Sequence, residues 1–279
     1  VIDDNESGIT HILRGDDHLK NSAKHLQLID AMGYKEPEFI HLPMILGPDG
    51  SRLSKRHGAM NILEYKDQGF LPEAMLNYLV RLGWSLGDQE VFNIQEMIDA
   101  FDVKNINKSS AKFDLEKLQW LNQQHLSNSH NSELIEFLKL NTSLKGLPSE
   151  NTIDSFIDAY KPRVNNLNEL VGYFDSLYTE QFSVEDSAAE KFLKQEILVP
   201  FQDLLEMLEQ GEWNTESINQ SVKSTCENHG IGFGKISQPL RVAITGGTES
   251  PSIDLTMILL DREIVISRIK KAIEYIANQ

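Results

Sequence analysis

The sequence predicts a mainly helical protein with a small α/β portion near its N-terminal end. Two runs with strand-like composition, residues 8–14 and 38–46, flank a segment whose apolar residues recur at helical spacing and which stops at Gly33. From residue 60 onwards the apolar residues follow the helical period, and strand signals almost vanish after Pro148. Since two strands and a crossover helix make a βαβ unit, we expect parallel strands first and helices thereafter.

Boundary signals divide the helical part into elements. Pro72 suits the first turn of a helix and Gly83 its end. Asn93 and Glu96 form a capping box that opens a second helix, and Asp114 is expected to cap a third. The expected buried face of the capping-box helix consists of Ile94, Met97, Ile98 and Phe101.

The later part of the chain predicts further helices joined by polar turns. Lys161 and Arg163 flank Pro162 at an expected helix break. The glycines of residues 230–247 follow no strand, which argues against a dinucleotide-binding fingerprint. Further helices are expected at residues 133–140, 153–160, 167–174 and 186–209, and from Asp261 onwards.

Composition excludes several classes of protein. The formal net charge of -16 argues against a general nucleic-acid binder, although local basic patches can still recognise a specific RNA. The single cysteine, Cys226, excludes an internal disulfide framework and is interpreted as structural. The histidine spacings match no helical metal-binding pair, so no metal site is expected. With neither a signal peptide nor an apolar run of membrane-spanning length, we expect a cytoplasmic protein without membrane contact.

Residues 47–58, GPDGSRLSKRHG, form the most distinctive stretch of the sequence. Pro48 and Gly50 indicate a turn in which glycine takes a positive φ. The three cations that follow are flanked by glycines, so this loop could close over a polyphosphate. When a nucleophile attacks the α-phosphorus of ATP, negative charge develops on the departing pyrophosphate, and preorganised cations stabilise that charge. They are Arg52, Lys55 and Arg56. A solvated surface turn remains the alternative interpretation of such a loop.

A second group of polar residues lies where the first expected strand ends. In parallel sheets, ligands bind beyond the carboxyl ends of the strands, and Arg14, Asp17 and His18 occupy that position. Arginine can bind a carboxylate through two parallel hydrogen bonds, and Asp17 could accept hydrogen bonds from ribose or amine groups. Alternatively, Arg14 forms a surface ion pair with Asp16 or Asp17.

Four stretches of the sequence carry a family resemblance that covers essentially the whole chain. They are HILRGDDH (residues 11–18), RLSKRHG (52–58), GFLPEA (69–74) and QPLRVAITG (238–246). These stretches resemble the bacterial glutamyl-tRNA synthetases, members of the class I aminoacyl-tRNA synthetases, and Leu-Ser-Lys-Arg resembles their KMSKS signature. Arg52 stands where the family commonly has lysine, which keeps the charge but changes its geometry.

The resemblance implies an organisation into three domains. Residues 1–60 are expected to form the second half of a Rossmann-type nucleotide-binding fold, and residues 61–126 a helical stem-contact domain. An all-helical anticodon-binding domain is expected at residues 127–279, with subdomains at about 127–185 and 186–279. The family's HIGH motif does not occur in this sequence, so we expect these 279 residues to be inactive alone.

The resemblance also implies an activity: ligation of glutamate to tRNA(Glu) through an adenylate made from ATP with Mg²⁺. The expected partners are tRNA(Glu), glutamate and ATP, with no DNA, and a monomer is expected. Lys55, helped by Arg52 and Arg56, would contact the ATP phosphates, and Arg14 would bind glutamate. The ATP site would consist of Asp17, His18, Ile45, Ser54 and Lys55. The anticodon would be contacted by Arg163, Arg241 and Lys235. For Ile45, an ordinary strand-core position remains the alternative.

Two other functions stay open at this stage. A glutaminyl-tRNA synthetase would share much of the catalytic half, but that relative reads its anticodon with β-barrels, which the helical periodicity after Pro148 opposes. A noncatalytic tRNA-binding module that has kept a synthetase body is the second alternative, and the intact Lys-Arg loop opposes it.

Overall fold

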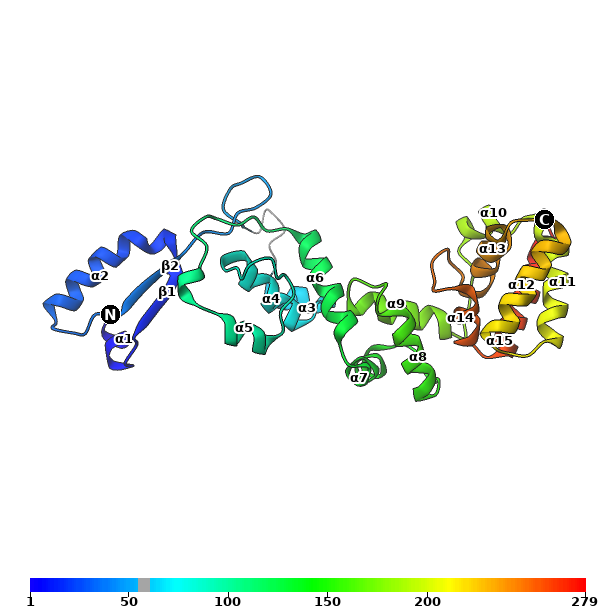
Figure 1. Ribbon diagram of the computed structural model, residues 1–279, viewed down its shortest axis with the longest axis horizontal. Helices are drawn as coiled ribbons and strands as arrows, with labels where there is room; N and C mark the ends of the chain where they lie inside the picture. Colours follow the sequence, from blue (N-terminus) through cyan, green and yellow to red (C-terminus); the bar gives the residue numbers. More distant parts are fainter. Residues whose placement is uncertain (55–60) are drawn as a thin grey trace. The chain divides into compact units, whose positions relative to one another are not determined.

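The computed structural model describes residues 1–54 and 61–279. The chain forms two compact units, Val1–Leu126 and Ser127–Gln279. Figure 1 labels the elements of each unit along the chain. Most of the regular elements in the described ranges are helices, as the sequence predicts, and the strands are confined to the first unit.

The first unit begins with the predicted βαβ arrangement. Strands β1 (His11–Gly15) and β2 (Glu38–Leu42) pair in parallel, with Arg14 opposite His41. A short helix, η1 (Asp16–His18), and helix α2 (Leu19–Ala31) connect them. The first strand begins later than predicted. Residues 8–10 lie outside it and follow a short helix, α1 (Ile2–Glu6), and Gly8 turns the chain there with a φ of +69°.

The second strand is shorter than predicted. Regular pairing stops at Leu42, directly before Pro43, which has no backbone N–H to donate to a ladder. The chain then reaches Leu46, whose N–H donates to the Ala111 carbonyl over 2.9 Å and whose carbonyl accepts from Phe113 N–H over 2.8 Å. These bonds attach the end of the α/β portion to the segment that precedes helix α6 (Leu115–Asn128).

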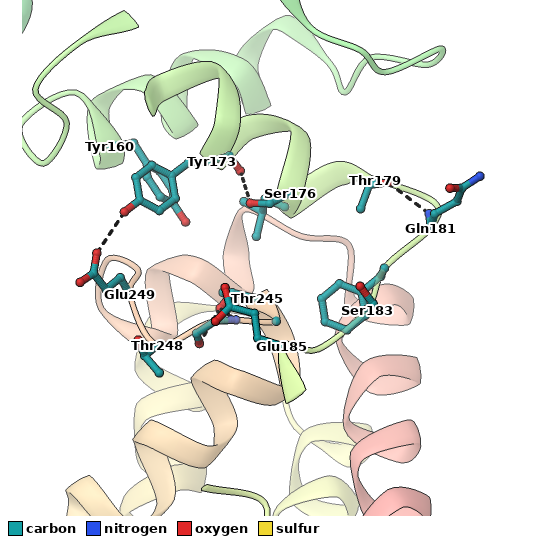
Figure 2. Close-up of a pocket in the computed structure, with 14 residues that line it drawn as sticks. Tyr160, Tyr173, Ser176, Thr179, Gln181, Ser183, Glu185, Thr245, Thr248 and Glu249 are labelled. Carbon is teal, nitrogen blue, oxygen red and sulfur yellow. Dashed lines mark hydrogen bonds between the residues drawn. The ribbon is translucent and has the colours of Figure 1, made fainter. Parts of the chain in front are cut away.

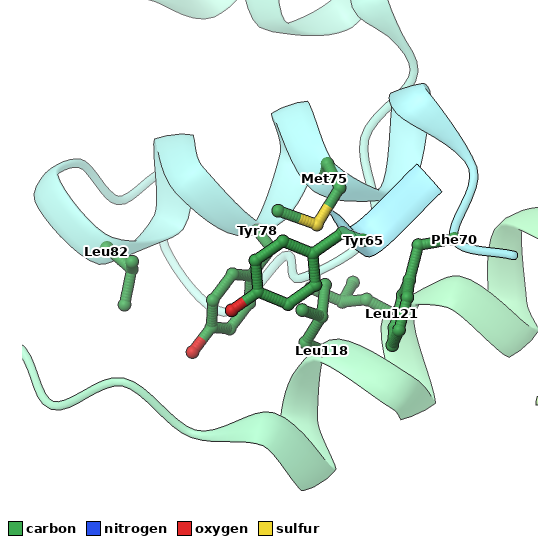
Figure 3. Packing of buried hydrophobic residues seen from close by; sticks show 7 residues of the cluster. All are labelled: Tyr65, Phe70, Met75, Tyr78, Leu82, Leu118 and Leu121. Atoms are coloured by element: carbon green, nitrogen blue, oxygen red, sulfur yellow. The ribbon is translucent and has the colours of Figure 1, made fainter. Parts of the chain in front are cut away.

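The rest of the first unit is helical. Helices α3 (Ile62–Asp67) and α4 (Pro72–Gly83) pack with α6 around one apolar cluster. Figure 3 shows its seven buried side chains, Tyr65, Phe70, Met75, Tyr78, Leu82, Leu118 and Leu121. Asp114 caps α6 as predicted, since its Oδ1 accepts from Lys117 N–H over 3.1 Å. The cluster therefore joins α3 and α4 to α6, which follows them later in the chain.

Helix α5 (Ile94–Ala100) corrects one prediction. Its capping box forms as expected, with Asn93 and Glu96 each accepting from the other's N–H. The predicted buried face is wrong, because Ile94 and Ile98 are 43% and 64% exposed. This helix has only two turns and is buried mainly through Met97, which joins Trp84 and Phe92 in a small cluster. Phe101 is also exposed, although its ring lies 6.0 Å from that of Trp84. A short 3-10 helix, η3 (Val103–Asn105), follows.

All regular elements of the second unit are helices. Its first part contains α7 (Asn131–Asn141), α8 (Glu150–Tyr160) and α9 (Leu167–Tyr178), in which α8 packs on both neighbours. The expected break at residues 161–163 follows α8 directly. No helix in the described ranges combines the length and apolar character that crossing a bilayer requires.

The remaining helices pack as a bundle around α13. They are α10 (Asp186–Phe192), η4 (Gln195–Ile197), α11 (Leu198–Gln210), α12 (Thr215–His229), α13 (Phe233–Thr245), α14 (Ile253–Ile258) and α15 (Arg262–Ala277). Helix α13 contacts α10, α12, α14 and α15. The single helix predicted at residues 186–209 is interrupted, because the chain buries both Leu193 and Ile197 at the break. Residues 233–245 are helical, in agreement with the absence of a dinucleotide fingerprint.

Candidate functional site

Arg14 lies at the carboxyl end of β1, where the sequence predicts a ligand site. Its Nη2 donates to Ser22 Oγ over 2.7 Å, and that oxygen lies 3.0 Å from His41 Nε2. The Arg14 guanidinium carbon lies 5.2 Å from the centre of the Phe39 ring. Arg14 Nε is buried without a hydrogen-bond partner in the described structure. The alternative ion pair with Asp16 or Asp17 does not occur, and these contacts fix the guanidinium against the sheet and α2.

Asp17 connects this strand end to the basic loop. Its Oδ2 lies 3.3 Å from Arg52 Nη1, and its Oδ1 lies 3.9 Å from His18 Nε2. A Cβ on Gly15 would lie 2.6 Å from Asp17 Oδ1, so glycine permits this close approach. Three predicted site residues, Asp17, His18 and Arg52, therefore lie together. Lys55 and Arg56, the other two cations of the predicted loop, lie outside the described residues.

The base of the basic loop forms the predicted turn. Gly50 has a φ of +78°, and its N–H donates to the Gly47 carbonyl over 3.0 Å. Asp49 Oδ1 accepts from the backbone N–H and the hydroxyl of Ser51 over 2.9 and 2.8 Å. This loop is thus preformed up to Ser54, a half-buried residue at the end of the described segment.

Ile45 contacts both the helical core of the first unit and the basic loop. Its side chain packs against the apolar cluster of α3, α4 and α6, as in the core interpretation. Its carbonyl accepts from Leu53 N–H over 2.9 Å and so supports the basic loop. The loop therefore rests on the helical core of the same unit.

In the second unit, Arg163 and Arg241 line one cavity of about 320 Å³. Arg163 is exposed in the turn that follows α8, whereas Arg241 lies half-buried on α13. Arg241 Nη1 donates to Ser250 O over 2.5 Å and to Pro251 O over 2.8 Å. Helix α13 and the segment after it hold this guanidinium in place. The other lining residues are Tyr160, Tyr173, Thr248, Glu249 and Ser250.

Burial and charge make this arginine cavity unusual. Burial lowers the pKa of Arg241, Tyr160 acts in the opposite sense, and the nearby Arg163 lowers it further. Arg241 Nε is buried without a partner in the described structure. The rings of Tyr160 and Tyr173 lie 5.3 Å apart, and burial raises the pKa of both phenols. Paired guanidinium groups beside aromatic rings can stack with nucleic-acid bases and donate hydrogen bonds to them.

The third predicted anticodon residue does not join this group. Lys235 is exposed in the first turn of α13 and does not line the arginine cavity. Conversely, Tyr173 and Glu249, which do line it, were not predicted. Tyr173 OH donates to Glu249 Oε2 over 3.1 Å across a long sequence separation. No local pattern marked either residue, because their proximity arises only when α9 meets the segment after α13.

The described residues contain no group of three or more His, Cys, Asp or Glu side chains arranged to hold a metal ion.

Two family models match the chain. Residues 1–120 match the catalytic domain of class I tRNA synthetases (E and Q), and residues 93–273 match an anticodon binding domain. The glutamate-tRNA ligase 1 of Alkalilimnicola ehrlichii is 44% identical, with 100% of this chain and 60% of the relative covered. The glutamate-tRNA ligase of Francisella tularensis subsp. novicida is 41% identical, with 98% and 60% covered.

Solved structures agree with these sequence matches. A glutamate tRNA ligase from Elizabethkingia meningosepticum, in complex with its amino acid, matches with a TM-score of 0.86 and 32% identity, covering 99% of this chain and 59% of that chain. The glutamate-tRNA synthetase from Elizabethkingia anophelis gives a TM-score of 0.80 and 32% identity, covering 98% and 58%. The chain spans about 60% of the length of the curated relatives it matches.

Proposed function

The chain belongs to the glutamate-tRNA ligase family of class I tRNA synthetases, and we propose that the whole protein ligates glutamate to tRNA(Glu) through an adenylate made from ATP. In this proposal residues 1–60 are the second half of the nucleotide-binding domain and residues 61–126 contact the tRNA stem. Residues 127–279 bind the anticodon in two subdomains, about 127–185 and 186–279. The protein acts as a cytoplasmic monomer, and its partners are tRNA(Glu), glutamate and ATP.

The observation that carries this proposal is the meeting of Arg163 and Arg241 in one cavity, beside the rings of Tyr160 and Tyr173. These residues lie within the region that matches an anticodon binding domain. Single-stranded RNA is recognised by stacking unpaired bases on aromatic rings and by hydrogen bonds to their edges. Since the chain has a net charge of -16, binding has to depend on such local contacts. Lys235 would contribute only a peripheral contact.

In this proposal the first unit supplies part of the groups for adenylate formation. Arg14, fixed by Ser22 and Phe39, binds the glutamate carboxylate, while Asp17 and His18 contact the nucleoside part of ATP. The Ile45 carbonyl and Ser54 line the same site. When glutamate attacks the α-phosphorus, negative charge develops on the departing pyrophosphate. Arg52, Lys55 and Arg56 stabilise that charge, and Mg²⁺ accompanies ATP as part of the substrate.

A binding titration tests the tRNA half of the proposal. The fluorescence anisotropy of labelled transcripts for glutamate, glutamine and an unrelated amino acid is measured against this chain at several salt concentrations. We expect preference for the glutamate transcript, weakened about five- to hundredfold by Arg163→Ala, because one specific arginine contact is worth about 1–3 kcal/mol. Lys271→Ala, which removes one exposed charge from α15, is the matched control. Equal binding of all three transcripts would contradict the proposal.

A turnover assay on the full-length protein tests the catalytic half. Lys55→Ala should lower adenylate formation about a hundredfold or more, because one charge-assisted transition-state contact is removed. The 279-residue chain should form no adenylate by itself. Near-normal turnover of the variant would contradict the role proposed for Lys55, whereas the absence of turnover in the unmodified full-length protein would favour the noncatalytic alternative. The glutaminyl alternative is disfavoured because all regular elements of the second unit are helices, and none belongs to a β-barrel.

A further inference from the structure

A second cavity, of about 440 Å³, adjoins the arginine cavity. Four residues line both, namely Tyr160, Tyr173, Thr248 and Glu249. Figure 2 shows that α9 and the segment after it form one wall, whereas the turn after α13 forms the other. The Tyr173–Glu249 hydrogen bond spans these two walls.

The walls of the second cavity are held together by several contacts. Gly246 has a φ of +83°, and a Cβ there would lie 2.5 Å from the Ser183 carbonyl oxygen. The Gly246 carbonyl accepts from Glu185 N–H over 2.9 Å. Because glycine alone allows this approach without strain, the turn after α13 sits directly against residues 183–185.

A buried arginine, Arg268, also links the same two walls. Arg268 on α15 donates through Nη2 to the Leu177 carbonyl over 2.8 Å and through Nη1 to the Ile244 carbonyl over 2.5 Å. Its guanidinium carbon lies 3.8 Å from the centre of the Phe182 ring. Leu177 and Phe182 line the cavity, and Ile244 directly precedes its other wall. These contacts pre-organise the cavity, which lowers the cost of ordering it when a ligand binds.

The second cavity has the opposite charge character to the first. Glu185 and Glu249 line it together with uncharged polar side chains, and its lining includes no Lys, Arg or His. A phosphate would therefore be repelled. Tyr173 OH donates a hydrogen bond to Glu249 Oε2, whereas Glu249 Oε1 accepts none from the described residues. A ligand suited to this site is uncharged and flat, and carries a hydrogen-bond donor.

We propose that the second cavity binds a tRNA base that carries an exocyclic amino group, which donates to the Glu249 carboxylate while the base stacks on Tyr173. This inference rests on the proposed anticodon-binding function and adds a second subsite of opposite polarity beside Arg163 and Arg241. A glutamate accepts a hydrogen bond from the cytosine amino group, whereas the corresponding carbonyl of uracil presents only an acceptor and is repelled. Glu249 is thus a specificity-determining residue.

The test compares cytosine with uracil at each anticodon-loop position in turn, with the affinity of this chain for each transcript as the measurement. At one position the unmodified chain should prefer cytosine about five- to hundredfold. Glu249→Gln should abolish that preference, because its amide can donate to the uracil carbonyl. Glu180→Gln, which removes one exposed negative charge outside both cavities, should preserve it.

The outcomes separate the two proposals. In one outcome the chain prefers the glutamate transcript and Arg163→Ala weakens that binding, but Glu249→Gln and Glu180→Gln show the same ratio of cytosine to uracil affinity at every position. The amino-base subsite is then wrong, and the anticodon function stands. If no transcript is preferred, both proposals are overturned. Loss of the cytosine preference at a single position in Glu249→Gln alone supports the subsite.

Discussion

Arg52 Nη1 lies 3.3 Å from Asp17 Oδ2, which connects the basic loop to the carboxyl end of β1 in the first unit. The Arg52 side chain is 69% exposed and that of Asp17 is 33% exposed. Water and salt therefore screen this ion pair, and the proposed move of Arg52 from its carboxylate partner to an ATP phosphate would cost little free energy.

We expect the Asp17–Arg52 pair to contribute little to stability. A double-mutant cycle with Asp17→Asn and Arg52→Gln, measured by urea unfolding, should give a coupling free energy below about 1 kcal/mol that falls with added salt. A coupling energy of about 2 kcal/mol or more, insensitive to salt, would mean that the pair is a fixed structural contact, and the proposed exchange of partners would be wrong.

Glu90 should make a larger contribution in the same unit. It accepts from Arg81 Nε and Nη2 over 3.1 and 3.0 Å and lies 2.9 Å from Lys117 Nζ. Hydrogen bonding from Arg81, followed by that from Lys117, lowers the pKa of Glu90 below its usual 4.5. Glu90→Gln should lower the free energy of unfolding at neutral pH by about 1–3 kcal/mol, because a bidentate charged contact is lost.

The pH dependence of this effect has a defined sign. Since the folded-state pKa is lowered, the stabilisation by Glu90 is complete above about pH 4.5 and is lost as the pH falls through the folded value. The stability difference between the unmodified chain and Glu90→Gln should therefore shrink below pH 4.5. Glu116→Gln, on the exposed side of α6, is the control and should change little at any pH. A difference that stays constant down to pH 2.5 would contradict the assignment.

Local patterns predicted the elements of this fold better than their buried faces. The capping box at Asn93 was predictable because both of its partners lie within one helical turn. The exposure of Ile98 was not, because periodicity identifies an apolar face and does not say what covers it. Arg163 and Arg241 were predicted individually from a family resemblance, yet their shared cavity depends on the packing of helices far apart in sequence. Glu249 carried no local signal at all.

We expect ionisation of Tyr78 to lower the free energy of unfolding at alkaline pH. This buried phenol accepts from Asp114 N–H over 2.6 Å, and burial raises its pKa to about 12. Because the folded-state pKa is raised, the stabilisation is complete below pH 10 and is lost as the pH rises towards 12. Between these values the unfolding free energy should fall by up to about 1.4 kcal/mol per pH unit for this group.

A phenylalanine substitution isolates the contribution of Tyr78. Tyr78→Phe should cost about 1 kcal/mol at pH 8, since Asp114 N–H loses its acceptor, and the cost should shrink above pH 10 because phenylalanine does not ionise. Urea unfolding at pH 8, 10 and 11 measures this. Tyr275→Phe, at a 43% exposed position on α15, is the control, and its effect should not change over that range. An equal pH dependence in both variants would refute the interpretation.

Arg268 should determine the stability of the second unit and the shape of its second cavity. Only 5% of this residue is exposed, and burial lowers its pKa to about 10, so it remains charged at neutral pH. Arg268→Met should lower the free energy of unfolding by about 2–5 kcal/mol, because the Leu177 and Ile244 carbonyls lose a charged donor. Arg268→Lys should recover only part of this loss, since one ammonium cannot reproduce the planar fork that reaches both carbonyls.

Hydrogen exchange distinguishes this local role from general destabilisation. In Arg268→Met, exchange should rise first in peptides that contain residues 177–185 and 244–250, while residues 62–83 of the first unit keep their protection. Arg262→Met is the matched control, because Arg262 also donates to two carbonyls, those of Leu208 and Glu209, but lies away from the cavity. If both variants raised exchange in the same cavity peptides, Arg268 would have no special part in holding those walls together.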